Sequence, residues 1–324
     1  MRLTSRLLRR LGRRRLADER GAVAVLVAVL LVPLLGFAAI AVDVASLYAD
    51  REQLRNAADA AALAVATDCA TGGCGNPTAT ATSALTANAG AADAAGATLR
   101  TPEVSVGGHS VTVTVSADQA HWFAPVLGID STRVTATATA TWTAMSHGVA
   151  QFPLAISWCE YKKQIAKYPL TSTVSHRLDW ELSWLTLCSG PSGGLTFGGG
   201  HALTGTDSSS VCRATSSVGQ YIDISVWSSW LPNRCSAKHL DGLIGTDLQI
   251  PVWDDVDGWL FGGYRAHVYG YALFHLTGYE LTYGEPTFYG YFTRAVVPLS
   301  ATSPTGTTPA ADLGATSISL SPQG

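Results

Sequence analysis

The sequence GAVAVLVAVLLVPLLGFAAIAV, from Gly21 to Val42, decides the architecture of this chain of 324 residues. These 22 residues contain no charged side chain. A helix rises about 1.5 Å per residue and the hydrocarbon core of a bilayer is about 30 Å thick, so the stretch is long enough to cross a membrane. Only a helix satisfies its own backbone hydrogen bonds there. We therefore predict a transmembrane helix over residues 21–43.

Charges are distributed unequally around this stretch. The first twenty residues carry eight arginines against Asp18 and Glu19, whereas Asp43 and Asp50 follow it. Basic flanks remain on the cytoplasmic side, which predicts a cytoplasmic segment 1–20 and an exported remainder anchored in the cell membrane. The net charge of -3 then leaves the exported part acidic, so no nucleic-acid partner is expected.

Processing of the apolar stretch has two alternatives. The apolar run of a signal peptide spans about 7–15 residues, and this run is longer, which favours an uncleaved anchor. Ala39-Ile40-Ala41 nevertheless offers a small-x-small cleavage site. A prepilin signal needs Glu five places after a glycine, and that place holds Ala41 after Gly36 and Leu26 after Gly21. No prepilin-type processing is expected.

The helical pattern continues beyond the apolar stretch as a predicted stalk over residues 44–67. Pro33 is expected to kink the long helix. Apolar residues fall on one helical stripe at Val44, Leu47, Leu54, Ala58, Ala61 and Val65. This stalk face packs either on the protein's own exported domain or on partner helices of an assembly.

A family resemblance rests on four motifs in a fixed order. They are Glu19-Arg20-Gly21-Ala-Val-Ala, Pro33-Leu-Leu-Gly-Phe-Ala, Ala41-Val-Asp43-Val-Ala-Ser-Leu-Tyr48 and Gln53-Leu-Arg-Asn56-Ala-Ala-Asp59-Ala-Ala-Ala-Leu63. The chain from about residue 18 to 68 resembles the N-terminal segment of TadG-like Flp pilus-assembly proteins. A later turn, Phe123-Ala-Pro-Val-Leu-Gly128, resembles the same family.

The resemblance implies a bitopic envelope protein that acts in assembly or secretion of tight-adherence pili. Its implied partners are the lipid bilayer and other pilus-assembly membrane proteins, which the stalk would contact. Many members carry a von Willebrand-type domain with an Asp-x-Ser-x-Ser metal motif. The nearest sequences, Asp223-Ile-Ser225-Val-Trp227 and Asp207-Ser-Ser209-Ser-Val211, both lack the second serine. A metal-dependent adhesion domain is therefore not expected.

The six cysteines of an exported chain predict disulfides, because the exported compartment is oxidising. Sequential pairing joins Cys69 to Cys74, Cys159 to Cys188 and Cys212 to Cys235. Six cysteines allow 15 connectivities, so the pairing stays open.

The exported part is predicted to be α+β and then mainly β. Residues 68–145 are expected to form a small α+β module, with a helix near 80–95, a hairpin around Gly107-Gly108, a short helix over 119–127 and a strand over 133–142. Of the 28 aromatic residues, only Phe37 and Tyr48 precede residue 120, so this module has few large side chains to bury.

Residues 146–299 are expected to form a Cys- and aromatic-rich, mainly-β domain. The alternation over 265–276 predicts a strand, which Thr277-Gly278 turns into a second strand at 279–283, with a third over 286–297. Residues 300–324 are rich in Ser, Thr, Pro and Gly and are expected to be a flexible tail.

The sequence around the candidate catalytic and metal motifs does not fit the structures in which such motifs work, so neither enzymatic activity nor a cofactor is expected. Gly190-Pro-Ser192-Gly-Gly194 matches the Gly-x-Ser-x-Gly string of hydrolases, but the sequence after it is not helical. An anchored hydrolase that uses Ser192 stays the less favoured alternative, with Asp254 or Asp255 and His267 or His275 completing the triad.

The Asp254-Asp255-Val-Asp257 cluster lacks the glycine and glutamate of an EF-hand loop, although an irregular calcium site there stays open. His267 and His275 lie eight residues apart on one strand, about 26 Å, and cannot share a metal. Tyr269 and Tyr271 between them are a candidate surface for a sugar or peptide, which would make the chain a cell-surface binding module.

Overall fold

The computed structural model describes residues 4–88, 97–178, 186–191, 195–198, 200–225, 235–259, 263–282, 285–297 and 310–321. The chain divides into two compact units. The first comprises Met1–Ala58, Thr82–Arg100 and Thr114–Thr137, and the second Asp59–Ala81, Thr101–Val113 and Ala138–Gly324. The strands β3 (Ser110–Ala120) and β4 (Ser131–Ala144) contribute residues to both units.

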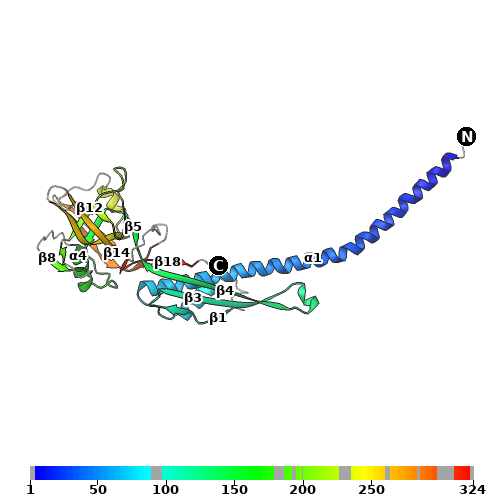
Figure 1. The fold of residues 1–324 in the computed structure, drawn as a ribbon, viewed down its shortest axis with the longest axis horizontal. Coiled ribbons are helices and arrows are strands. Elements are labelled where there is room, and N and C mark those ends of the chain that lie inside the picture. The colour runs from blue at the N-terminus through cyan, green and yellow to red at the C-terminus, as the bar shows by residue number, and fades with distance from the viewer. Residues whose placement is uncertain are drawn as a thin grey trace. The chain divides into compact units, whose positions relative to one another are not determined.

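A single helix, α1 (Thr4–Thr71), contains both the apolar stretch and the predicted stalk. It continues through Pro33, and Figure 1 draws it as a smooth curve rather than as two segments meeting at an angle. The helix extends past the predicted end at residue 67. Its last turns are followed by Gly72 and Gly73, whose positive φ angles of 144° and 154° end the helix.

The first unit contains most of the hairpin that follows α2 (Pro77–Asn88) and β1 (Thr98–Leu99). The hairpin is formed by β3 (Ser110–Ala120) and β4 (Ser131–Ala144), and β2 (Glu103–Ser105) pairs with the start of β3 as predicted. Every second residue is buried from Val111 to Ala117 in β3 and from Val134 to Trp142 in β4, so one face of this part of the hairpin is covered.

The helix predicted over 119–127 is wrong in its first half. Strand β3 continues to Ala120, and only η1 (Ala124–Leu127), a single 3-10 turn, is helical. Gly128, at a φ of 82°, ends that turn and returns the chain to β4. The strand continues because its alternation persists through Ala117, which is buried in the same face as Val115.

The second unit is mainly β, with two short helices, α4 (Trp158–Lys167) and α5 (Ala237–Asp241). Its remaining strands are β5 (His147–Ala150), β6 (Leu154–Ser157), β7 (His176–Leu178), β8 (Thr186–Ser189), β9 (Leu195–Gly198), β10 (His201–Thr204), β11 (Ala214–Ser217), β12 (Tyr221–Ser225), β13 (Asp247–Trp259), β14 (Gly263–Thr282), β15 (Glu285–Thr293), β16 (Ala295–Val296), β17 (Ala311–Leu313) and β18 (Ala315–Leu320).

Five of these strands close into a ring. The order is β12, β10, β6, β13 and β14, and β14 pairs again with β12. One residue from each of these strands belongs to a shared buried cluster: Ala155, Ala202, Ile224, Trp253 and Ala266. Closure also removes free edges between these strands.

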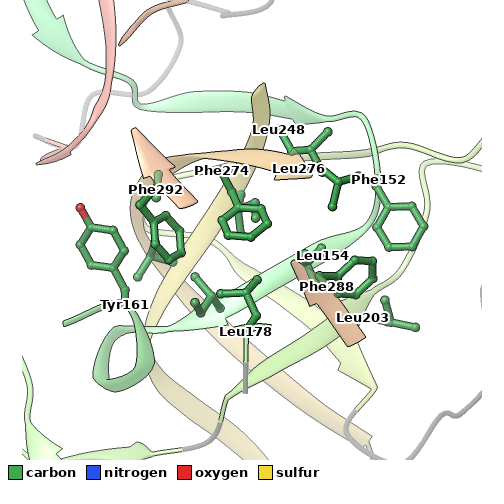
Figure 2. Packing of buried hydrophobic residues seen from close by; sticks show 14 of the residues in the cluster. Phe152, Leu154, Tyr161, Leu178, Leu203, Leu248, Phe274, Leu276, Phe288 and Phe292 are labelled. Atoms are coloured by element: carbon green, nitrogen blue, oxygen red, sulfur yellow. The ribbon is translucent and has the colours of Figure 1, made fainter. Parts of the chain in front are cut away.

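A large aromatic core, drawn in Figure 2, gathers buried side chains from α4, β6, β13, β14 and β15. Its aromatic rings pack edge to face, Tyr161 on Phe292 at 5.1 Å between ring centroids and Phe274 on Phe292 at 5.2 Å. The buried Tyr161 hydroxyl donates a hydrogen bond of 2.8 Å to the carbonyl of Leu313. Aromatic residues from the part of the chain after residue 120 therefore pack in this core.

The predicted hairpin at Thr277-Gly278 is wrong, because β14 is one strand of 20 residues. Its pairing with β15 shifts register between Leu276 and Gly278, a bulge that the chain passes without turning. Both faces of β14 are buried in its centre, since Phe274 belongs to the core of Figure 2 and Leu273 to a separate cluster with Met145 and Val297.

The predicted flexible tail is wrong for residues 310–321. Strand β17 pairs in parallel with β14, and β18 pairs antiparallel with β4. Leu313 is 4 % exposed and Ile318 8 % exposed, so the tail buries apolar side chains. A low-complexity composition did not prevent this, because Leu313, Ala315 and Ile318 supply apolar side chains that the neighbouring strands bury.

Disulfides join Cys69 to Cys74, Cys159 to Cys188 and Cys212 to Cys235, the pairing in sequence order. All three lie in the second unit. The expected combination of a long apolar N-terminal helix with a mainly-β, disulfide-containing domain is thereby confirmed.

Candidate functional site

The apolar stretch of α1 is exposed along its whole length. Of the described side chains from Gly21 to Val42, none is buried, and Val32 and Phe37 are more than 70 % exposed. Among the described residues, one helix is long and apolar enough to cross a membrane, with a mean hydropathy of 2.9 in its most apolar window. So large an apolar surface is unstable in water, which is consistent with membrane association.

Asp43 directly follows this stretch and is only 5 % exposed. Its Oδ1 accepts hydrogen bonds from the backbone N–H groups of Trp122, at 2.8 Å, and Phe123, at 3.1 Å. Its Oδ2 accepts from the N–H groups of Phe123, at 3.2 Å, and Ala124, at 2.7 Å. One carboxylate thus fixes the hairpin turn to the helix, 79 to 81 residues away in sequence.

The turn that Asp43 holds carries five large apolar side chains into solvent. We call them the apolar tip: Trp122, Phe123, Val126, Leu127 and Ile129, which are 49 % to 88 % exposed. The base of the turn is closed by the N–H of His121, which donates to the carbonyl of Asp130 at 3.0 Å. Sequence analysis missed the apolar tip and Asp43; the usable signal was a run of large apolar residues in a turn that follows an alternating strand.

The predicted stalk face lies mostly inside the protein. Leu54, Ala58, Ala61 and Val65 are at most 2 % exposed, whereas Leu47 is partly exposed. These four positions are thus buried by the chain itself.

Each aspartate of the predicted acidic cluster contacts a different side chain. Asp254 Oδ1 lies 2.7 Å from His267 Nδ1, Asp257 Oδ2 accepts from Arg265 at 2.7 Å, and Asp255 accepts from the Tyr221 hydroxyl at 3.3 Å. The carboxylates are thus engaged individually. No group of three His, Cys, Asp or Glu side chains that could hold a metal ion occurs within the described ranges.

The other histidine of β14, His275, pairs with Asp247 at 2.7 Å and stacks on Tyr291. His267 and His275 therefore have separate carboxylate partners, on successive parts of β13. Asp207, in one of the incomplete metal motifs, accepts from Thr215 and Arg213. Burial raises the pKa of Asp207, and these donors lower it to a net value below the ordinary one.

The predicted tyrosine platform is wrong for Tyr271. This side chain is fully buried, its hydroxyl is hydrogen-bonded to Ser216 at 2.7 Å, and burial raises its pKa. Tyr269 packs against Trp158, with ring centroids 5.5 Å apart. Tyr269 packs against the core of Figure 2, whereas Tyr271 belongs to the separate cluster with Met145. The pairing of β14 with β13 shifts register between them, since Val252 pairs with Gly270 and Trp253 with Val268, which leaves Tyr269 as the extra residue. Ser192, the candidate nucleophile, lies outside the described residues.

The fold and the site define a class of protein, namely a mainly-β, disulfide-bonded domain carried by a long N-terminal helix with an exposed apolar segment. Residues 21–68 match the family model described as "Putative Flp pilus-assembly TadE/G-like". The resemblance predicted for the N-terminal segment is thereby confirmed. Neither the curated proteins nor the solved structures contain a significant match to this chain.

Proposed function

We propose that this chain is a single-pass envelope protein of a Flp (tight-adherence) pilus-assembly or secretion system, with a non-catalytic role. The N-terminus is cytoplasmic and the β domain is exported. One observation carries the proposal: the matched segment, residues 21–68, contains both the uncovered apolar stretch and the Asp43 contact that ties the helix to the hairpin.

The orientation follows from charge and chemistry. Arginines concentrate before the apolar stretch, which favours a cytoplasmic N-terminus. The disulfides lie after it, in the part that would reach an oxidising compartment.

The topology is tested by protease treatment of intact cells that produce the chain with an N-terminal tag and a C-terminal tag. We expect the C-terminal tag to be lost and the N-terminal tag to be protected. Lysed cells, in which both tags should be digested, serve as the control. Protection of the C-terminal tag with loss of the N-terminal tag would contradict the orientation.

Contact with partner membrane proteins would use the part of the matched segment that remains uncovered. Tyr48 is 67 % exposed one turn beyond Asp43, and Val44 lies four residues before it on the same helical face. A Val44→Ala, Tyr48→Ala variant should lose co-purifying pilus-assembly proteins, whereas Gln53→Ala, at an exposed position further along α1, should retain them. Equal recovery from both variants would remove this surface from the proposal.

A further inference from the structure

The side chains of the apolar tip are exposed, although several of its backbone N–H groups are hydrogen-bonded. Asp43 accepts the N–H groups of Trp122, Phe123 and Ala124. Within the turn, the N–H of Gly128 donates to the carbonyl of Pro125 and that of Ile129 to Ala124. A turn can enter an apolar medium only if its polar backbone groups are paired in this way.

The composition of the tip also suits a lipid interface. The ten residues from His121 to Asp130 contain no lysine, arginine or glutamate, and Asp130 is the one acidic residue at the base. Trp122, at 77 % exposed, is the residue type that favours the level of the lipid headgroups. Val126 and Leu127, at 88 % and 76 % exposed, are farther out in the turn and carry only hydrocarbon.

The position of the tip is set by Asp43, which belongs to the same compact unit. Asp43 immediately follows the 22 uncharged residues that span about 33 Å as a helix, so it marks the end of the hydrocarbon region. The tip is bonded to that residue, and Figure 1 shows the end of the β3–β4 hairpin beside α1, directed toward the N-terminal half of the helix.

We propose that the apolar tip inserts into the outer leaflet beside the transmembrane helix, at the boundary between headgroups and acyl chains. The inference rests on the proposed span of Gly21–Val42. It gives the chain a second membrane contact, about 80 residues from the first in sequence, and makes Asp43 the positioning residue that sets the depth of the tip. The occupant is lipid because the tip lies at the level where the span ends.

The test uses the full chain reconstituted into vesicles of phosphatidylcholine and phosphatidylglycerol. All six native cysteines are in disulfides, so Val126→Cys introduces one free thiol for an environment-sensitive fluorophore. Leu30→Cys reports on the span, and Ile244→Cys, 45 % exposed in the second unit, serves as the aqueous control. Depth is measured by quenching with nitroxide-labelled lipids and with iodide in the water.

We expect lipid nitroxides to quench the labels at positions 30 and 126 several-fold more than the label at 244. Quenching at 30 without quenching at 126 would overturn the tip insertion and leave the proposed span intact. A lack of quenching at 30 would overturn the span, and with it this inference. Shielding of 126 from both iodide and lipid nitroxides would show that a second copy or another protein covers the tip, which also overturns the inference.

A second variant tests insertion without disturbing the core. Leu127→Asp, in the Val126→Cys background, places a charge at an exposed position and should reduce nitroxide quenching several-fold, because a carboxylate resists transfer into the bilayer. Leu281→Asp, at an exposed position in β14, is the matched control and should leave quenching unchanged. Equal quenching in both variants would overturn the proposal.

Discussion

At the scale of single residues, Asp43 connects the helix to the hairpin through three backbone N–H groups. Asp43→Asn replaces one acceptor oxygen with an NH₂ donor that faces the N–H groups. We expect amide hydrogen exchange at Trp122, Phe123 and Ala124 to accelerate roughly tenfold or more, because the turn opens locally. Asp130→Asn is the control in the same turn and should leave these amides protected.

Gly290 shows how closely two strands of the core approach each other. A Cβ at Gly290 would lie 2.1 Å from the carbonyl oxygen of His275 and 2.6 Å from the ring of Phe274. Gly290→Ala should lower the free energy of unfolding by about 1–3 kcal/mol, since backbone cannot yield as a flexible side chain does. Gly278→Ala, with open space around its Cβ, is the control, and chemical denaturation compares the two.

At the scale of elements, the C-terminal strands complete the fold. Leu313 packs in the core of Figure 2, whereas Leu320, 37 % exposed, lies at the end of β18. Leu313→Ala should cost about 2–5 kcal/mol of stability, and Leu320→Ala should change it by less than about 0.5 kcal/mol. If denaturation shows that both variants leave stability unchanged, the C-terminal strands do not contribute to the fold, and the flexible tail predicted from the composition would be supported.

A second feature at this scale is the burial of small side chains, both in α1 and in the hairpin. Ala57, Ala58, Ala61 and Ala62 are fully buried, and alternate residues of β4 include Ala136, at 8 % exposed. Alanine permits close approach of backbones, and it can be buried without large aromatic residues. The scarcity of aromatics before residue 120 is therefore no obstacle to a packed hairpin.

At the scale of the whole molecule, the three disulfides contribute to stability according to the length of chain that each one closes. In the chain-entropy account, a bond that closes a longer loop stabilises more. Cys159 and Cys188 are 29 residues apart and Cys69 and Cys74 only 5. Replacing the first pair by serine should cost about 1.5 kcal/mol more than replacing the second, as measured by denaturant unfolding. A larger effect of the short loop would contradict this order.

Sequence reasoning succeeded where the signal is local. The apolar run, the helix that follows it and the alternation of Val111-Thr-Val-Thr-Val115 depend on neighbouring residues, and the structure contains the helix and strand that they predict. The turn predicted at Thr277-Gly278 is wrong because bulges and turns use the same residue types. Pairing with the partner strand β15 makes this position a bulge. Sequence reasoning failed for Tyr271 because burial of the second face of β14 depends on distant segments, including Ala315.

By itself, the sequence determined the apolar helix, the cysteines available for pairing and the N-terminal segment that matches the Tad family. The tertiary structure alone decided which carboxylate holds the hairpin turn, how five strands close into a ring and that the C-terminal residues dock. The physical reason is separation along the chain. Helical periodicity acts over three or four residues, whereas Asp43 meets Ala124 across 81, and only the folded chain brings them together.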